Sequence, residues 1–323
     1  MPGGESIARR RLVPLAAAAL FLAGGAAVAG ASTKAVVKSA VAPAGSPALD
    51  VMAVSADDLA PGASIRRQGY TKQPDFTLYY RREFKPGASL GRAKLLALDS
   101  EVGLVETSDD ATTAADSIET VLRSKKGRLA LARAAVEDAG LSLTGLRVSS
   151  AGIRELAVGD AAFIFPLTVL LQRRVRVSVV FELVRVDRVI QVVYLVGQVN
   201  ARVAGAEAVR LLNVVASRMV AGLVPSSVML PSISGIPQVG VPVTADLGAW
   251  TNTPSSFAVQ WLRCDTSGAN CAPIDGATGA GYVPVATDAG STLEVSVIAS
   301  NSVGSSQPAL SPASAVVLAG AGP

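Results

Sequence analysis

Three long apolar segments that follow one another between residues 161 and 196 constrain the fold of this chain most strongly. They cover Ala161–Leu171, Val175–Val186 and Val189–Val196, and they are rich in Val, Leu and Phe. In the second segment alternate positions are apolar, which is the period of a β-strand with a buried face. Asp187 and Arg188 separate the last two segments, and two residues are the length of a tight hairpin turn. We therefore expect neighbouring antiparallel strands.

The segments on either side of these strands add helices to the expected sheet. Residues 111–122 place apolar side chains at helical spacing behind the capping residues Ser108–Asp110. In chain order we expect a short helix near 55–59, strands over 75–85 and 93–105, helices over 108–122 and 128–139, a strand over 147–153, the three strands above and a helix over 204–221. This order indicates an α+β domain over residues 49–224, an antiparallel sheet with helices on one face.

A basic stretch followed by an uncharged one opens the chain, as in an export signal. Arg9, Arg10 and Arg11 precede the uncharged residues 12–31, which end on the small residues Ala29-Gly30-Ala31. We expect a cleavable signal peptide over 1–31 and a flexible spacer over 32–48. The protein is then secreted or associated with the cell surface, with no stable membrane span after cleavage. The alternative is an uncleaved N-terminal anchor, because the uncharged stretch is close to the length of a membrane span.

The chain contains no histidine, which removes the usual general base and the usual zinc ligand. Adjacent acidic pairs occur at expected helix ends, where capping accounts for them. We find no phosphate-binding glycine loop, no Ser–Lys motif with supporting residues and no cluster of metal ligands. We therefore expect no catalytic residue, no metal site and no cofactor. An envelope enzyme of a histidine-free class is the alternative.

The charge of the chain is unevenly distributed. Residues 32–224 carry 25 basic and 19 acidic side chains, whereas residues 225–323 carry one basic and five acidic ones. A mildly basic exported domain suits an anionic partner, and it equally suits plain solubility. Arg174 and Arg176 share one face of an expected strand and are candidate ligand contacts; a solvated sheet face is the other interpretation. Aromatic residues make up 4% of the chain, which argues against a nucleic-acid surface.

The C-terminal region has the pattern of a second, all-β domain. Residues 225–236 are rich in Ser and Pro, as in a linker. Short strands expected over 241–245, 256–263 and 292–301 are separated by Gly, Asn and Ser turns, which is typical of a β-sandwich over residues 237–318. Alternation within the second of these strands places Trp261 in the core, as is usual for a tryptophan on this strand of a sandwich, and an exposed ligand platform is the alternative.

Four short motifs in this region carry a resemblance. They are Pro237–Gly240 (PQVG), Gln260–Asp265 (QWLRCD), Asp288–Gly290 (DAG) and Asn301–Gly304 (NSVG). With these motifs the segment resembles the bacterial immunoglobulin-like repeats of exported actinobacterial proteins. The resemblance implies an immunoglobulin-like sandwich that serves as a spacer or adhesion module.

The first domain also resembles a known group. Its order of elements, together with the opening Ala56–Gly62 (ADDLAPG), is similar to the extracellular sensor-like domains of mycobacterial-type receptor kinases and of related lipoproteins. The resemblance covers roughly residues 49–224 and is mainly architectural. It implies a binding or sensor-like role without catalysis.

Cys264 and Cys271 are the two cysteines of the chain. An exported protein meets an oxidising compartment, and Gly268 and Asn270 between them permit a tight reversal, so we expect a disulfide across a loop. Half of a metal site and a redox pair are the alternatives. Trp250 lies beside an expected turn and is a candidate exposed ligand contact.

These observations favour a non-catalytic, exported protein of the cell envelope that binds or senses. The expected partner is a cell-wall polymer, an envelope lipid or an envelope protein, and not a nucleic acid. A purely structural or adhesive surface protein is the alternative.

Overall fold

The computed structural model describes residues 46–172, 175–197 and 205–320. The chain divides into two compact units, the first ending at Gly222 and the second beginning at Leu223. The expected signal peptide over 1–31 and nearly all of the expected spacer lie outside the described residues, as does Arg174. No helix in the described part is long and apolar enough to cross a membrane.

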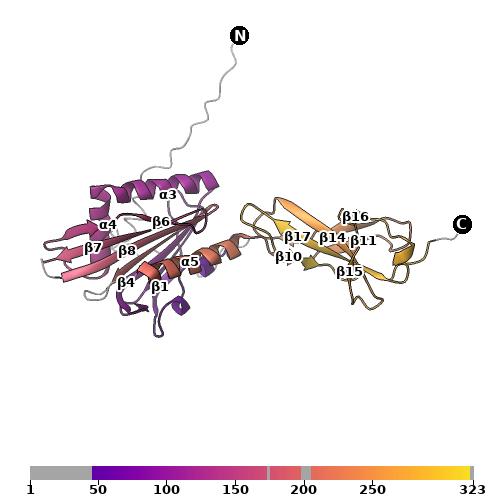
Figure 1. Ribbon diagram of the computed structural model, residues 1–323, viewed down its shortest axis with the longest axis horizontal. Coiled ribbons are helices and arrows are strands. Elements are labelled where there is room, and N and C mark those ends of the chain that lie inside the picture. Colours follow the sequence, from indigo (N-terminus) through magenta and orange to yellow (C-terminus); the bar gives the residue numbers. More distant parts are fainter. Residues whose placement is uncertain (1–45, 173–174, 198–204, 321–323) are drawn as a thin grey trace, which may run out of the picture. The chain divides into compact units, whose positions relative to one another are not determined.

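The first unit is built on a nine-stranded sheet in which every pair of neighbours is antiparallel (Figure 1). The order across the sheet is β1-β2-β4-β9-β8-β7-β5; β3 pairs with β4, and β6 pairs with β7. The strands are β1 (Ile65–Tyr70), β2 (Leu78–Phe84), β3 (Ser89–Leu90), β4 (Ala93–Leu104), β5 (Arg147–Ser150), β6 (Arg154–Leu156), β7 (Ala161–Leu171), β8 (Val175–Val186) and β9 (Val189–Gly197). The two-residue turn between β8 and β9 places Asp187 at a φ of 49°.

Except for a short first helix over Leu49–Met52, which the sequence does not predict, the helical elements of this unit begin and end close to the predicted positions. They are α2 (Leu49–Met52), the 3-10 turn η1 (Ala56–Asp58), α3 (Ser108–Arg123), α4 (Lys125–Asp138) and α5 (Gly205–Leu223). At the start of α3 the Thr107 hydroxyl accepts a hydrogen bond from the Asp110 amide, and the Asp110 carboxylate accepts one from the Thr107 amide, both at 3.1 Å. Such a reciprocal cap satisfies amides that the first turn leaves without a helical partner.

One face of the sheet, which we call face 1, packs against α3 and α4. Its core combines Ile118 and Leu122 of α3 with Phe165, Phe181 and Val192 of the central strands, all nearly inaccessible to solvent. These strand residues belong to the alternating apolar set that the sequence places on one side of the strands. Burial of this set provides the main apolar contact of the helices.

The opposite face, face 2, is also covered. Every residue of β9 is buried, including Val193 and Leu195, which point away from α3 and α4. The segment after α2 crosses face 2, where the Val54 amide donates to the Ser100 hydroxyl at 3.1 Å. The prediction that all helices lie on one face is therefore wrong, because both sets of alternating β9 side chains are apolar and both need cover.

Helix α5 completes the cover of face 2, on the side of the sheet away from α3 (Figure 1). Its predicted apolar stripe, which includes Leu211, Val215 and Met219, is buried. Arg218 forms an ion pair with Asp58 of η1 and donates to the Asp58 carboxylate at 2.7 Å. Gly222 lies so close to Met52 that a Cβ at this position would come within 2.6 Å of the Met52 methyl carbon. The last helix of the unit thus packs on its first helical elements.

The second unit consists of short antiparallel strands and the 3-10 turn η2 (Ala286–Asp288). The strands are β10 (Ser227–Met229), β11 (Ser232–Ser234), β12 (Val243–Asp246), β13 (Ala249–Trp250), β14 (Ser256–Cys264), β15 (Ala272–Pro273), β16 (Gly281–Tyr282), β17 (Thr292–Ser300) and β18 (Ala309–Leu310). They form sheets β15-β14-β17-β18, β11-β12-β16 and β10-β13. Residues 225–236, expected as a linker, contain β10 and β11, which pair with β13 and β12.

One apolar core holds this unit together. Trp261 of β14 is fully buried and packs with Leu293 and Val295 of β17 and with Val243 of β12, so that two sheets share the core. The indole nitrogen of Trp261 donates to the Gly279 carbonyl at 2.9 Å, which satisfies its one polar group. The prediction of a core Trp261 is confirmed.

The Arg218–Asp58 ion pair gives a test of how α5 is attached. Replacing Arg218 by Met keeps the apolar stem but leaves the buried Asp58 carboxylate without its charged partner, so we expect a loss of about 2 kcal/mol in unfolding free energy. The measurement is urea unfolding followed by far-UV circular dichroism, because the α-helices belong to the first unit. Arg133→Met, at an exposed position of α4, is the control and should change little. Equal losses in the two variants would contradict this account of α5.

Candidate functional site

A cluster of charged side chains is buried in face 1, where β2 and β4 lie side by side. Arg81 of β2 forms ion pairs with Glu83 on its own strand and with Asp99 and Glu101 on β4. The Arg81 Nε donates to the Asp99 carboxylate at 2.7 Å and lies 3.3 Å from Glu83 and 3.4 Å from Glu101. One guanidinium therefore forms ion pairs with three carboxylates. All four side chains lie on the same sheet face, because Arg81 and Glu83 are two residues apart on β2 and Asp99 and Glu101 are two residues apart on β4.

Two further arginines connect this cluster to the edge of the sheet. Arg66 and Arg67 of β1 donate to the two carboxylate oxygens of Glu83, with their shortest contacts at 2.7 and 2.6 Å. Arg66 also reaches Asp138, the last residue of α4, at 3.4 Å. Burial alone would raise the pKa of Glu83, but the arginines around it outweigh this effect and hold its pKa below 4.5. The ion pairs thus join β1, β2, β4 and α4.

The pKa values of the two carboxyl groups of β4, Asp99 and Glu101, are shifted in the opposite direction, upward. Burial raises the pKa of Asp99 above its ordinary value even though Arg81 lies beside it. Burial, and then the charge of neighbouring Asp99, raises the pKa of Glu101. The hydroxyls of Tyr79 and Tyr194 face the same group, and burial raises the pKa of both. The cluster has fewer positive than negative groups, and it retains a proton at a pH where an exposed carboxyl group would have lost it.

Carboxyl groups with raised pKa values are common at catalytic sites. Here, however, Asp99 and Glu101 are each 1% exposed, so that no substrate reaches them in this conformation. The cluster can hold a proton, and its ion pairs connect β2 to β4. We assign it a structural role. Sequence reasoning missed it, although Arg81 and Glu83 in one expected strand and Asp99 and Glu101 in the next already alternate in step.

Glu182 is a second buried carboxyl group and lies on face 2. It is 2% exposed, and its neighbours across the sheet are Ile164 and Val193. Among the described residues neither of its carboxylate oxygens has a hydrogen-bond partner. Burial raises the pKa of Glu182 well above 4.5, so this side chain keeps its proton to a higher pH than an exposed glutamate does.

Part of face 2 is not covered by any of the described elements. Across β5, β7 and β8 the side chains of Arg147, Leu170 and Arg176 form one row, because Leu170 is the register partner of both arginines. The next row consists of Ser149, Thr168 and Ser178, and all six residues are exposed or half-buried. We call these two rows, together with Arg154 of β6, the open strip. Arg154 pairs with Ile164 on β7 and therefore points to the same face.

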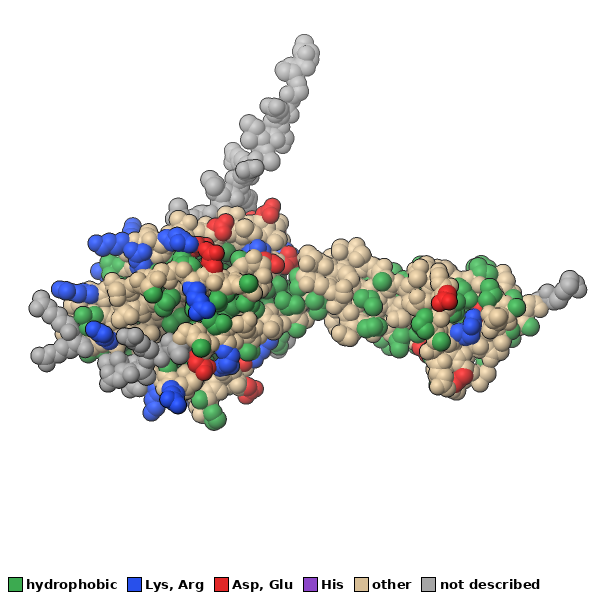
Figure 2. All heavy atoms as spheres, in the orientation of Figure 1, with side chains coloured by type: hydrophobic (Ala, Val, Ile, Leu, Met, Phe, Trp, Pro, Cys, Tyr) green, Lys and Arg blue, Asp and Glu red, His purple; other side chains and the backbone are tan. Residues whose placement is uncertain are grey.

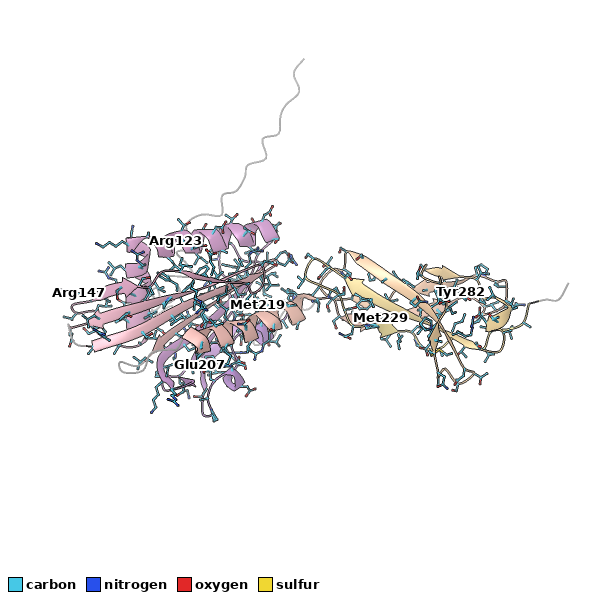
Figure 3. The ribbon with its side chains drawn as sticks, in the orientation of Figure 1. Arg123, Arg147, Glu207, Met219, Met229 and Tyr282 are labelled. Carbon is cyan, nitrogen blue, oxygen red and sulfur yellow. A yellow bond between two sulfur atoms is a disulfide. The ribbon has the colours of Figure 1, made fainter. Side chains whose placement is uncertain are left out.

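The structure places the predicted contact Arg176 on this open strip, where it is exposed. Figure 3 shows Arg147 at the end of the sheet where β5 begins, and Figure 2 shows Lys and Arg side chains spread over the visible surface of the first unit. Sequence reasoning grouped Arg176 with its chain neighbours and missed Arg147 and Arg154. The signal for these two arginines is strand pairing, which a single sequence does not reveal.

Trp250, the other predicted contact, is half-buried in the second unit. Its indole nitrogen donates to the Leu247 carbonyl at 2.8 Å, and its ring centroid lies 6.2 Å from that of Phe257. Part of the ring packs against the core of the unit. A ligand contact by Trp250 stays a prediction, and it would have to use the exposed edge of the ring.

Cys264 and Cys271 form the predicted disulfide. The loop between them is organised by Asp265, whose carboxylate accepts hydrogen bonds from Ser267, Ala269 and Asn270. The hydrogen bond from the Ser267 hydroxyl is the largest of the effects that hold the pKa of Asp265 below 3.8. A carboxylate oxygen of Glu294 lies within 4.8 Å of both sulfurs, but sulfurs joined in a disulfide offer no thiolate to a metal ion.

Comparisons with known proteins add little to this geometry. No family model matches the chain, and no curated protein matches it. A search of solved structures found domains A168-A170 from titin, with 9% sequence identity and a TM-score of 0.22 over 80% of this chain and 84% of that chain. We draw no conclusion about this protein from a likeness of that size.

The buried carboxyl groups predict an unusual dependence of stability on pH. Below pH 4 they are protonated in the folded and unfolded states alike. As the pH rises, the unfolded chain releases protons that Asp99, Glu101 and Glu182 retain in the folded state, so we expect the free energy of unfolding to fall from about pH 5 toward pH 8. Each group contributes at most about 1.4 kcal/mol per pH unit.

Urea unfolding of the first unit at several pH values measures this fall. Glu182→Gln cannot titrate and should show a shallower decline than the unsubstituted chain, whereas Glu106→Gln, at an exposed position, should not differ from it. Stability that is constant or that rises over this range would contradict the buried, protonated state of these groups.

The disulfide closes a short loop and should stabilise the second unit alone. Replacing both Cys264 and Cys271 by Ala should cost about 2–3 kcal/mol, which is the chain-entropy value for so short a ring. Tryptophan fluorescence isolates this effect, because both tryptophans of the chain, Trp250 and Trp261, lie in the second unit. The helical circular dichroism of the first unit is the internal control, and a shift of both transitions would argue against a local role.

Proposed function

We propose that this chain is an exported, non-catalytic binding or sensor-like protein of the cell envelope. The first unit is the α+β, sensor-like part and carries the binding surface. The second unit is an immunoglobulin-like sandwich, similar to the repeats of exported actinobacterial proteins, and serves as a spacer or adhesion module.

The observation that carries this proposal is the contrast between two groups of arginines in the first unit. Arg66, Arg67 and Arg81 form ion pairs with carboxylates of the chain itself. Arg147 and Arg176 stand exposed on the open strip, with no ion pair to any described residue. Exposed charge that the fold does not use is available to a partner, which favours binding as the function of this surface.

Two features support the exported location. The basic and then uncharged start of the sequence has the pattern of a signal peptide over 1–31. The Cys264–Cys271 disulfide suits an oxidising compartment outside the cytoplasm.

An adhesive role of the second unit is the second candidate, and one observation favours it. Val228, Met229 and Leu230 are consecutive, and they are 66%, 64% and 56% exposed. Grouped apolar side chains on a surface favour contact with another molecule. In this alternative the second unit makes the functional contact and the first is a structural support.

Fractionation of cells that produce the full chain tests the proposal. We expect a processed form that begins near Ser32, retained on the envelope fraction and released by high salt, since charged surfaces lose affinity when screened. A variant without residues 2–31 is the control and should stay in the cytoplasm. Recovery of the full chain from the cytoplasm would refute export, and recovery free in the medium would refute envelope binding.

A further inference from the structure

We infer that the open strip of the first unit binds an extended anionic polysaccharide that carries phosphate groups. This inference rests on the proposed function, since it names the partner of the binding surface. The residues that carry it are Arg147, Arg154 and Arg176, which come from three different strands and point to one face of the sheet.

The spacing of these arginines prevents all three from binding one small anion together. Arg147 and Arg176 are two strands apart, about 10 Å at the usual distance between strands. The rows of Arg147 and Arg154 meet β7 at Leu170 and Ile164, six residues apart, which corresponds to about 20 Å along the strand. Three guanidinium groups so far apart cannot close on one phosphate, but they can each bind a different phosphate of one long chain.

The charge of the strip suits such a polymer. Arg147, Arg154 and Arg176 are exposed, and none of them has an ion pair with a carboxylate among the described residues. Glu182, in the same cross-strand row as Arg154, is separated from it by Ile164 and is itself buried. The positive charge of the strip is therefore not neutralised by any carboxylate of the described residues.

Neutral groups between the arginines suit the sugar part of the polymer. Ser149, Thr168 and Ser178 form a row of hydroxyl groups next to the Arg147–Arg176 row. Hydroxyl side chains can both donate to and accept from the hydroxyls of a sugar. The strip thus places a charged row beside a hydroxyl row, and Arg154 lies beyond the intervening row of Pro166 and Val180. Charged and neutral groups are likewise neighbours in a phosphorylated polysaccharide.

Two other polyanions fit this strip less well. A lipid surface is bound most firmly where apolar side chains can enter it, and the large hydrophobic residues exposed in the described part of the first unit, Val51 and Val220, lie on α2 and α5. Single-stranded nucleic acid is bound through aromatic side chains that stack on bases, and the strip contains none.

Binding of the full chain to phosphorylated dextran, measured by calorimetry at several salt concentrations, tests the inference. Neutral dextran, vesicles containing phosphatidylglycerol and single-stranded DNA are the comparison probes. The test variant combines Arg147→Gln, Arg154→Gln and Arg176→Gln. The matched control combines Arg92→Gln, Lys126→Gln and Arg133→Gln, which removes the same charge from exposed positions outside the strip.

We expect phosphorylated dextran to bind and neutral dextran not to bind. Each arginine removed from the strip should weaken binding about tenfold at low salt, and the triple variant should flatten the salt dependence by about three charges. The control should bind within a few-fold of the unsubstituted chain. Because all six positions are exposed, circular dichroism should show unchanged folding in both variants.

Equal losses in the test and control variants would overturn the inference, because net charge and not the strip would then determine binding. Tighter binding to vesicles or to DNA would also overturn it. If phosphorylated dextran fails to bind while the protein is still retained on the envelope fraction, this inference fails and the proposed function stands. If retention fails as well, both fail.

Discussion

The burial of both faces of the central strands is the constraint on which the rest of the first unit depends. Strand β9 exposes none of its residues, and β8 is buried along its middle. A sheet of this kind needs a layer on each side, so α3 and α4 cover face 1 while the α2 segment and α5 cover face 2. The apolar side chains of these two strands thus require helical cover on both sides of the sheet.

Burial on both sides also determines what charged side chains in the sheet can do. On β2 and β4, Arg81, Glu83, Asp99 and Glu101 point into face 1 and are stable there because they lie beside one another. Glu182 has no such neighbour and keeps its proton to a higher pH than an exposed glutamate does. Where the cover ends, Arg176 keeps its charge in contact with solvent. The same sheet therefore uses charge in three ways, according to the depth at which each residue lies.

The sequence alone predicts the central strands closely, because β7 is an almost continuous apolar run, β8 alternates, and both have clear ends. It misses β1, since Arg66, Arg67 and Gln68 have the composition of a polar loop and their strand is held by ion pairs to Glu83. It also misses that face 2 is covered, because the apolar stripe of α5 does not say which face it meets. The Arg81 cluster can be read from the alternation of two expected neighbouring strands. The open strip depends on the register of β5 and β6 against β7, which local patterns do not reveal.

The contact between α5 and the α2 segment has a consequence for how the first unit can form. Arg218 and Asp58, and likewise Gly222 and Met52, are separated by most of the length of the unit and yet lie in contact. The part of face 2 that α5 covers therefore stays exposed until the last helix has been synthesised, and a chain interrupted before α5 exposes the apolar side of β9. Contacts between such distant residues slow folding. The two ends of the unit therefore cannot close it until nearly all of it has been made.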